Sequence, residues 1–395
     1  MEHGAKQTIN RNKWPKSFVL LALVLALISA SFVGCSTDSK STPENNTDEL
    51  SGPVVDSASI PTEVISQETG SVAEDISGNH WEFDMSENHG MNATLLQELH
   101  GALESTQMLS FVTVRDGYIV DEYYKEGYDE NSIFTYQSGS KSFTSALLGI
   151  AMDEGYIAGL DVSIAEYFPQ LKDTDKEAVT IRHLLEHTSG IQWFEWGDNA
   201  SSWDVWRNSE NWVDYVLTQP VVTTPGSTFN YSTGGTHLLS AILEQVTGES
   251  LLEYGRRHLF EPMSMDSATW GTDPQGITDG GNGIAMTARD AAKFGQLFLD
   301  GGNWKGRQLV PAAWVEESTS RQSSGSGSAG VYGFQWWIRQ FGEKEYRTYY
   351  AMGHAGQYIL VVPDLKLVSV ITSTLNQTTY TPWPYFSDYV VDACE

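Results

Sequence analysis

The apolar residues that follow Ser138 repeat with the period of an α-helix. Members of the set recur at spacings of three and four positions, which places them on one face and predicts that this face is buried. The set comprises Phe143, Ala146, Leu147, Ile150 and Ala151. Glu154-Gly155 marks the end of the pattern. We therefore predict a buried helix that begins near Ser138.

Short apolar runs near both ends of the chain predict β-strands. Met108 to Tyr124 contains two runs around Asp116-Gly117, a dipeptide typical of a tight hairpin turn. Four later runs predict strands at 334–338, 349–353, 358–362 and 367–372.

Helical spacing predicts further helices at about 95–103, 160–171, 181–187, 231–247, 287–300 and 385–391. The expected fold is α+β, with one antiparallel sheet built from N- and C-terminal strands and flanked by helices. A mainly helical subdomain is inserted at about 160–285. The folded domain is expected to cover residues 81–395.

The first 34 residues resemble a bacterial lipoprotein signal peptide. Four basic residues precede an uncharged apolar run that ends at Gly34-Cys35. This likeness implies that Cys35 is lipidated and that the protein is exported, anchored to the cell membrane and facing outside the cytoplasm. The alternative is an uncleaved membrane anchor, since about 18 apolar residues can just span a bilayer.

Residues 35–80 are acidic, rich in Ser and Thr, and almost free of aromatic side chains. Such a segment buries too little surface to offset its ordering entropy, so we expect a disordered tether. Cys394 is the only cysteine besides Cys35. If Cys35 is acylated, no disulfide is available.

The formal net charge of the whole chain is −28. This charge argues against nucleic acid or an anionic lipid surface as a ligand. The sequence contains no Gly-x-Ser-x-Gly, which argues against the nucleophile elbow of α/β-hydrolases.

Ser138 is followed three residues later by Lys141, the only Ser-x-x-Lys in the sequence. Residues three apart share a helix face, and a serine hydroxyl needs an adjacent base to become a nucleophile. A lysine is a base only when neutral, which at pH 7 costs roughly 4 to 5 kcal/mol from its usual pKa of about 10.4. Burial of Lys141 is therefore required. By itself the motif favours an ordinary N-capped core helix with an exposed lysine, and the rest of the chain has to overturn that interpretation.

Three short motifs follow one another along the chain: Ser138-x-x-Lys141, Tyr231-Ser232-Thr233, and His354-Ala355-Gly356. This order resembles the serine β-lactamase and penicillin-binding protein superfamily, whose Ser-x-x-Lys, (Ser/Tyr)-x-Asn and Lys-Thr-Gly elements form one site. The closest likeness is to the class C-like branch, with its esterases, 6-aminohexanoate dimer hydrolases and D-aminopeptidases.

The resemblance implies an acyl-enzyme on Ser138, with Lys141 and Tyr231 moving its proton. Tyr231 would serve as partner base and then protonate the leaving group. The backbone N–H groups of Ser138 and Gln357, beside Gly356, would form the oxyanion hole. His354 stands at the place of the usual lysine and would contact substrate. No cofactor is implied.

Two departures from the pattern bear on the substrate. Thr233 replaces an asparagine that would contact substrate, and His354 replaces a permanently charged lysine. Both changes favour a small ester or amide, peptidoglycan-derived fragments included, over a β-lactam. The alternatives are a D-alanyl-D-alanine carboxypeptidase or class C-type β-lactamase, and an inactive surface binding lipoprotein.

The tryptophan-rich stretch 191–212 is a candidate substrate wall, with Trp196 and Trp206 as the residues to test. Its acidic residues, Glu195 among them, favour an amine-bearing or apolar acyl group. The alternative is that most of these rings are core. His183 and His187 have a spacing that could chelate zinc, but no third ligand is suggested, so no metal is expected.

Overall fold

The computed structural model describes residues 80–195, 202–375 and 382–394. The predicted signal peptide, Cys35 and nearly all of the predicted tether lie outside these ranges, as does Trp196. The described residues fall in one compact unit, Val72–Glu395. None of the helices in the described ranges is long and apolar enough to cross a membrane.

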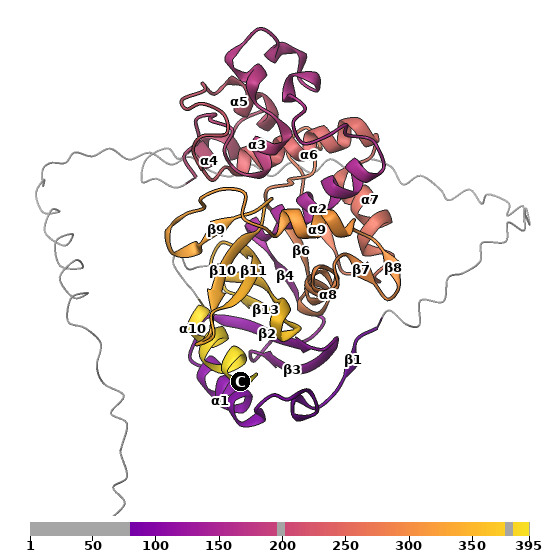
Figure 1. The fold of residues 1–395 in the computed structure, drawn as a ribbon, viewed down its shortest axis with the longest axis vertical. Helices are drawn as coiled ribbons and strands as arrows, with labels where there is room; N and C mark the ends of the chain where they lie inside the picture. The colour runs from indigo at the N-terminus through magenta and orange to yellow at the C-terminus, as the bar shows by residue number, and fades with distance from the viewer. Residues whose placement is uncertain (1–79, 196–201, 376–381, 395) are drawn as a thin grey trace, which may run out of the picture. The chain divides into compact units, whose positions relative to one another are not determined.

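An eight-stranded sheet forms the centre of the fold, and its strands alternate antiparallel except where β1 runs parallel to β3 (Figure 1). In sheet order the strands are β1 (Glu82–Phe83), β3 (Tyr118–Tyr124), β2 (Met108–Arg115), β13 (Leu367–Ser373), β12 (Gln357–Val362), β11 (Tyr346–Gly353), β10 (Trp337–Phe341) and β9 (Val331–Tyr332). The N-terminal strand β2 pairs directly with the last strand, β13. The predicted α+β architecture, with both ends of the chain in one sheet, is confirmed.

Helices cover both faces of this sheet. The elements are α1 (Ala93–Leu103), α2 (Ser140–Asp153), α3 (Ile181–Leu185), α4 (Ser202–Arg207), α5 (Trp212–Thr218), α6 (Thr233–Thr247), α7 (Leu251–Gly255), α8 (Ala288–Leu299), α9 (Ala312–Ser318) and α10 (Trp383–Tyr385). α8 packs on β2, β12 and β13. On the other face α1 packs against a π-helical segment, Phe386–Val391, that continues α10.

The structure differs from the predicted elements in several places. The run Phe334-Gln335-Trp336 precedes β10 instead of opening it, because Gln335 has a φ of 65° that no strand residue adopts. β5 (Thr269–Trp270) and the start of β6 (Ile284–Thr287) lie within the range predicted to be mainly helical. They pair with β4 (Ile133–Thr135) in a second sheet.

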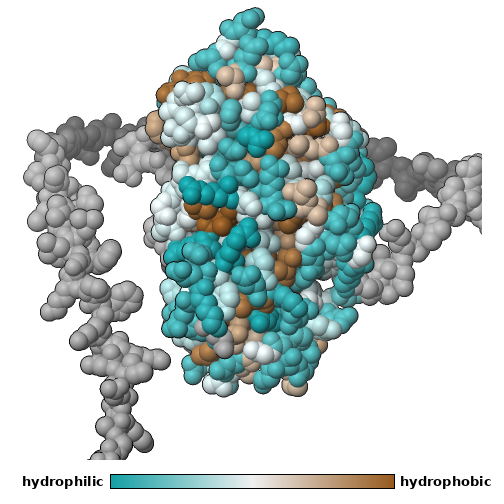
Figure 2. All heavy atoms as spheres, viewed as in Figure 1, coloured by the Kyte–Doolittle hydropathy of each residue, from teal (hydrophilic) through white to brown (hydrophobic). Residues whose placement is uncertain are grey.

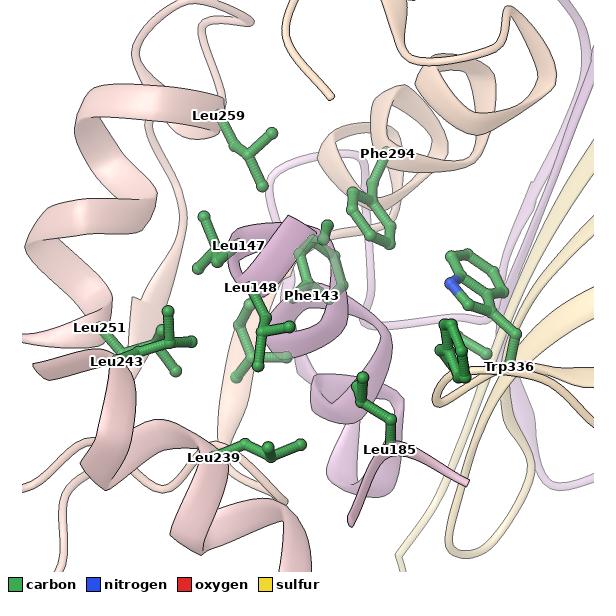
Figure 3. Close-up of a cluster of buried hydrophobic side chains, with 14 of the residues drawn as sticks. Phe143, Leu147, Leu148, Leu185, Leu239, Leu243, Leu251, Leu259, Phe294 and Trp336 are labelled. Atoms are coloured by element: carbon green, nitrogen blue, oxygen red, sulfur yellow. The ribbon is translucent and has the colours of Figure 1, made fainter. Parts of the chain in front are cut away.

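Helix α2 is buried around almost its whole circumference, from Ser140 to Ala151. Its Phe143 ring stacks on Phe294 of α8 with centroids 3.7 Å apart, while Leu147 and Leu148 face the leucines of α6 and α7 (Figure 3). α2 therefore links the sheet side of the molecule to the helical side. The surface in Figure 2 is mainly hydrophilic, with apolar atoms in small separate groups.

Candidate active site

The N-terminus of α2 positions Ser138. The residue lies in a 3₁₀ turn, Gln137–Gly139, that runs directly into the helix. Gln137 has a φ of 50°, an unusual conformation for a side-chain-bearing residue, and sparsely populated backbone conformations cluster at functional sites. A Cβ at Gly353 of β11 would lie 2.1 Å from the Tyr136 carbonyl oxygen, so the turn and the sheet touch through their backbones.

Lys141 is buried, with 1% of its surface exposed, and its Nζ reaches three oxygens. Nζ lies 3.0 Å from Ser138 Oγ, 2.9 Å from Thr233 Oγ1 and 2.7 Å from the Gly281 carbonyl. An ammonium spends all three of its donors on these contacts. A neutral amine has two donors and one lone pair, so it can serve two of the oxygens and accept the Ser138 proton.

Burial lowers the pKa of Lys141 to about 8, although the charges of Glu195 and Asp279 oppose the shift. The fraction of neutral lysine near pH 7 to 8 is therefore substantial. This is the electrostatic condition that the Ser-x-x-Lys hypothesis requires for a lysine base.

Tyr231 borders the same site from the loop before α6. Its ring lies under Lys141 Nζ, 4.9 Å from the ring centroid, and stacks on Trp337. Burial and the charge of Glu195 raise the pKa of Tyr231 well above its usual value, and its hydrogen bond with Ser138 only partly offsets them. The phenol is therefore protonated at neutral pH. A protonated phenol fits the predicted donation of a proton to the leaving group, and the predicted role of partner base stays a prediction.

His187 is a site residue whose contacts were not anticipated. Its Nδ1 accepts from the Ser232 N–H at 3.3 Å, so the proton sits on Nε2, which donates to Tyr332 Oη at 3.1 Å. The ring lies 4.6 Å from that of Tyr231. Burial and the charge of Lys141 lower the pKa of His187 well below its usual value. His187 is thus a neutral ring packed against Tyr231.

The zinc spacing of His183 and His187 has no counterpart in the structure. His183 Nδ1 accepts from the backbone N–H of Thr180 in a capping box at the start of α3, while the His187 ring packs against Tyr231. Across the ranges that the structure describes, no three His, Cys, Asp or Glu side chains are grouped so as to hold a metal ion.

Thr233 and Trp206 are not placed to touch substrate, which corrects two predictions. Thr233 is fully buried, and its hydroxyl binds Lys141 and Glu195. Trp206 is also fully buried, packed between Trp193 and Trp212, with its indole N–H on the Trp212 carbonyl. The core interpretation of the tryptophan-rich stretch is therefore correct for Trp206.

Gln357 opens β12, and His354 and Gly356 lie in the turn between β11 and β12. The 3₁₀ turn that holds Ser138 contacts both strands. The Gln357 side chain points away from it, because its Nε2 donates to the Ser373 carbonyl at 2.8 Å. The oxyanion hole formed by the backbone N–H groups of Ser138 and Gln357 stays a prediction, together with substrate contact by His354.

Glu195 is the functional candidate that sequence reasoning misassigned. It was expected to face a substrate amine, but it is buried and accepts hydrogen bonds from Trp193 and from Thr233. No local signal separates it from the other acidic residues of the stretch, because its partner Thr233 is 38 positions away.

A pocket of about 250 Å³ adjoins the nucleophile at Gln137. It is bordered by Trp203, Arg207, Asp279 and Asn282 among others, and Arg207 Nη1 donates to Asp279 Oδ2 at 2.8 Å. A larger pocket of about 500 Å³ lies at Trp81, Tyr118 and Trp304, away from the site. Of these two pockets, the smaller one is placed to hold part of a substrate attacked by Ser138.

A family model described as Beta-lactamase matches residues 99–383, which include every element of this site. The chain belongs to the β-lactamase family. Members of this family are hydrolases that act on small amide or ester substrates, and this β-lactamase-family protein is a serine hydrolase.

Three relatives illustrate the similarity of this β-lactamase-family protein. The 6-aminohexanoate-dimer hydrolase of Paenarthrobacter ureafaciens is 31% identical over 266 residues, or 62% of this chain and 68% of that enzyme. Penicillin-binding protein 4* of Bacillus subtilis is 28% identical over 190 residues, 46% of this chain and 38% of that protein. The structure of a candidate 6-aminohexanoate-dimer hydrolase from Bacillus anthracis superposes with a TM-score of 0.65 at 26% identity, covering 74% of this chain and 80% of the other.

Proposed function

We propose that this protein is an extracytoplasmic hydrolase that cleaves an ester or small amide through an acyl-enzyme on Ser138. The observation that carries the proposal is the position of Lys141 Nζ, buried and 3.0 Å from Ser138 Oγ, with a pKa of about 8. A buried amine that is partly neutral at physiological pH supplies the base that the serine lacks.

In the proposed acylation, Ser138 Oγ attacks the substrate carbonyl carbon while its proton passes to Lys141 Nζ. The carbonyl π-electrons move to the oxygen, which the N–H groups of Ser138 and Gln357 would stabilise. When the tetrahedral intermediate collapses, the leaving oxygen or nitrogen takes the proton of the Tyr231 phenol, which Lys141 replaces. Water then attacks the acyl-enzyme by the reverse sequence and restores Ser138.

The similarity to a 6-aminohexanoate-dimer hydrolase supports an unstrained linear amide as one substrate class. The pocket at Gln137 supports a substrate with a short chain on one side of the scissile bond. The absence of a permanently charged lysine at position 354 favours these substrates over β-lactams and D-alanyl-D-alanine peptides.

Active-site labelling tests the proposal. Wild-type protein is expected to react with a fluorophosphonate at Ser138 and to lose the label in Ser138→Ala. A panel of p-nitrophenyl esters, D-amino amides and 6-aminohexanoate dimers then ranks the substrates. Labelling by penicillin instead, or efficient nitrocefin turnover that is lost in Ser138→Ala, would replace the proposed ester or amide hydrolase with a D,D-peptidase or β-lactamase. Labelling by neither reagent would leave a binding protein.

The extracytoplasmic location rests on the N-terminal sequence. A lipid precursor fed to cells is expected to label the wild-type protein and not Cys35→Ser. Equal labelling of both would contradict anchoring through Cys35. Protease accessibility of the domain in intact cells checks which side of the membrane it faces.

A further inference from the structure

A hydrogen-bonded chain runs from the candidate base away from the nucleophile. Lys141 Nζ lies 2.9 Å from Thr233 Oγ1, and Thr233 Oγ1 makes a very short contact with Glu195 Oε1. Glu195 and Thr233 come from separate segments, the tryptophan-rich stretch and the first residue of α6. Both are buried, so the chain is shielded from solvent.

Two N–H groups that can only donate set the direction of hydrogen bonding along this chain. Glu195 Oε2 accepts from the Trp193 indole N–H at 2.5 Å and from the Thr233 backbone N–H at 2.9 Å, neither of which can act as an acceptor. A carboxyl group that meets two such donors at one oxygen and a hydroxyl at the other has the surroundings of an ionised carboxylate. The Thr233 hydroxyl therefore donates to Glu195, and its oxygen accepts from Lys141.

This direction decides where the Lys141 lone pair points. The neutral amine has two N–H donors, and the Thr233 hydroxyl oxygen and the Gly281 carbonyl take both. The lone pair is left for the third neighbour, Ser138 Oγ. If the Thr233 hydroxyl were free to turn, it could donate to Lys141 and occupy that lone pair.

We propose that Glu195 is a positioning residue that acts through the Thr233 hydroxyl to aim the Lys141 lone pair at Ser138. Glu195 also helps Lys141 to keep the proton that it receives, because the negative charge of the carboxylate stabilises the ammonium through Thr233. The inference rests on the proposed function. It explains the departure at Thr233, since a hydroxyl both accepts and donates at the single point between an amine and a carboxylate.

Other groups also face Lys141. Asp279 favours its ammonium form, while neutral His187 and protonated Tyr231 carry no charge at pH 7. Asp279 is tied to Arg207, whose cation offsets part of its effect. Glu195 is the acid joined to Lys141 through one bridging hydroxyl.

A structural role for Glu195 predicts different behaviour. Its carboxylate lies at the positive end of α6, a 15-residue helix, and could simply cap it. If Glu195 were only a cap, Glu195→Gln would lower stability and, by removing a nearby negative charge, the Lys141 pKa, but it would leave the plateau rate of labelling unchanged. The plateau rate, reached when Lys141 is neutral, therefore separates the two roles.

The test measures the second-order rate of fluorophosphonate labelling of the full chain against pH. Glu195→Gln and Thr233→Val are each expected to lower the plateau rate about 10- to 100-fold. Each is also expected to move the rising limb of the pH–rate profile to lower pH. Thr233→Ser keeps the hydroxyl and should stay within about twofold of wild type. The double variant should be no slower than the slower single variant, since both changes break one chain. Glu186→Gln, a change at another buried glutamate, should leave the rate and the limb unchanged.

An unchanged plateau rate in Glu195→Gln would show that Glu195 is only a cap, and additive losses in the double variant would separate Glu195 from Thr233. Titration of the Lys141 Cε signal by NMR, assigned with Lys141→Met, gives a readout that needs no reaction. The Lys141 pKa should fall in Glu195→Gln, and an unchanged value would overturn the inference. Absence of labelling in wild type would instead refute the proposed function, and the NMR titration would still decide the coupling.

Discussion

The indole ring of Trp337 stacks on the phenol ring of Tyr231, with centroids 5.8 Å apart and planes inclined by 21°. Trp337 is the first residue of β10, and its ring is also packed edge-on against Tyr332. The sheet therefore fixes the plane of a ring whose hydroxyl must meet Ser138. Aromatic stacking holds this geometry without offering a polar group that competes for the phenol.

Trp337→Leu is expected to slow fluorophosphonate labelling and ester turnover about tenfold, because Tyr231 gains freedom to tilt away from Ser138. Trp337→Phe keeps an aromatic face and should lose less. Trp383→Leu is the matched control, since Trp383 packs on Phe341 and Arg339 toward the other end of β10. Equal losses in Trp337→Leu and Trp383→Leu would attribute the effect to general loosening.

The rate of Ser138 labelling is expected to rise with pH and to level off above about pH 8. Lys141 must be neutral to accept a proton, and burial lowers its pKa to about 8, so each pH unit below that value should cost about tenfold. A pH–rate profile from 5.5 to 9.5 checks this. A flat profile, or one that rises only above pH 10, would contradict Lys141 as the base.

Gly353→Ala is expected to slow labelling at least about tenfold and to destabilise the fold by about 1 to 3 kcal/mol. An added Cβ would lie 2.1 Å from the Tyr136 carbonyl oxygen and force β11 away from the turn that holds Ser138. Gly101→Ala is the control. Its Cβ meets nothing within 4 Å, and alanine in helix α1 should stabilise by up to about 1 kcal/mol.

Phe143→Ala is expected to lower the free energy of unfolding by about 3 to 5 kcal/mol, measured by urea denaturation. The ring is fully buried and stacks on Phe294, so its removal leaves a cavity between α2 and α8. Val222→Ala, at a side chain that is 57% exposed, should change stability by no more than about 0.5 kcal/mol. A small effect at Phe143 would mean that the neighbouring helices collapse into the space.

The sequence was sufficient for features that depend on neighbours along the chain. The period after Ser138 predicted α2 and put Lys141 one turn from the serine, as found. The hairpin turn at Asp116-Gly117 was equally local, because both residues take the positive φ that such a turn needs.

Features that depend on distant contacts were missed. Glu195 and Thr233 are 38 positions apart, and neither residue type indicates a bridge to Lys141. Trp206 belongs to a tryptophan-rich stretch that suggested a substrate-binding surface, but it has the contacts of a core residue. The strand start at Trp337 depends on a single backbone torsion at Gln335, whose side chain is held by carbonyls of Leu184 and Leu185.

The pairing of β2 with β13 sets the order in which the molecule can assemble. Val112 meets Val370, and Val114 meets Val368, so the middle of the sheet joins segments more than 250 residues apart. Contacts of such long range are slow to form, because a large loop must close before they contribute. A nascent chain lacks this strand pair until residue 373 has been made, so the sheet is expected to form only after β13 has been synthesised.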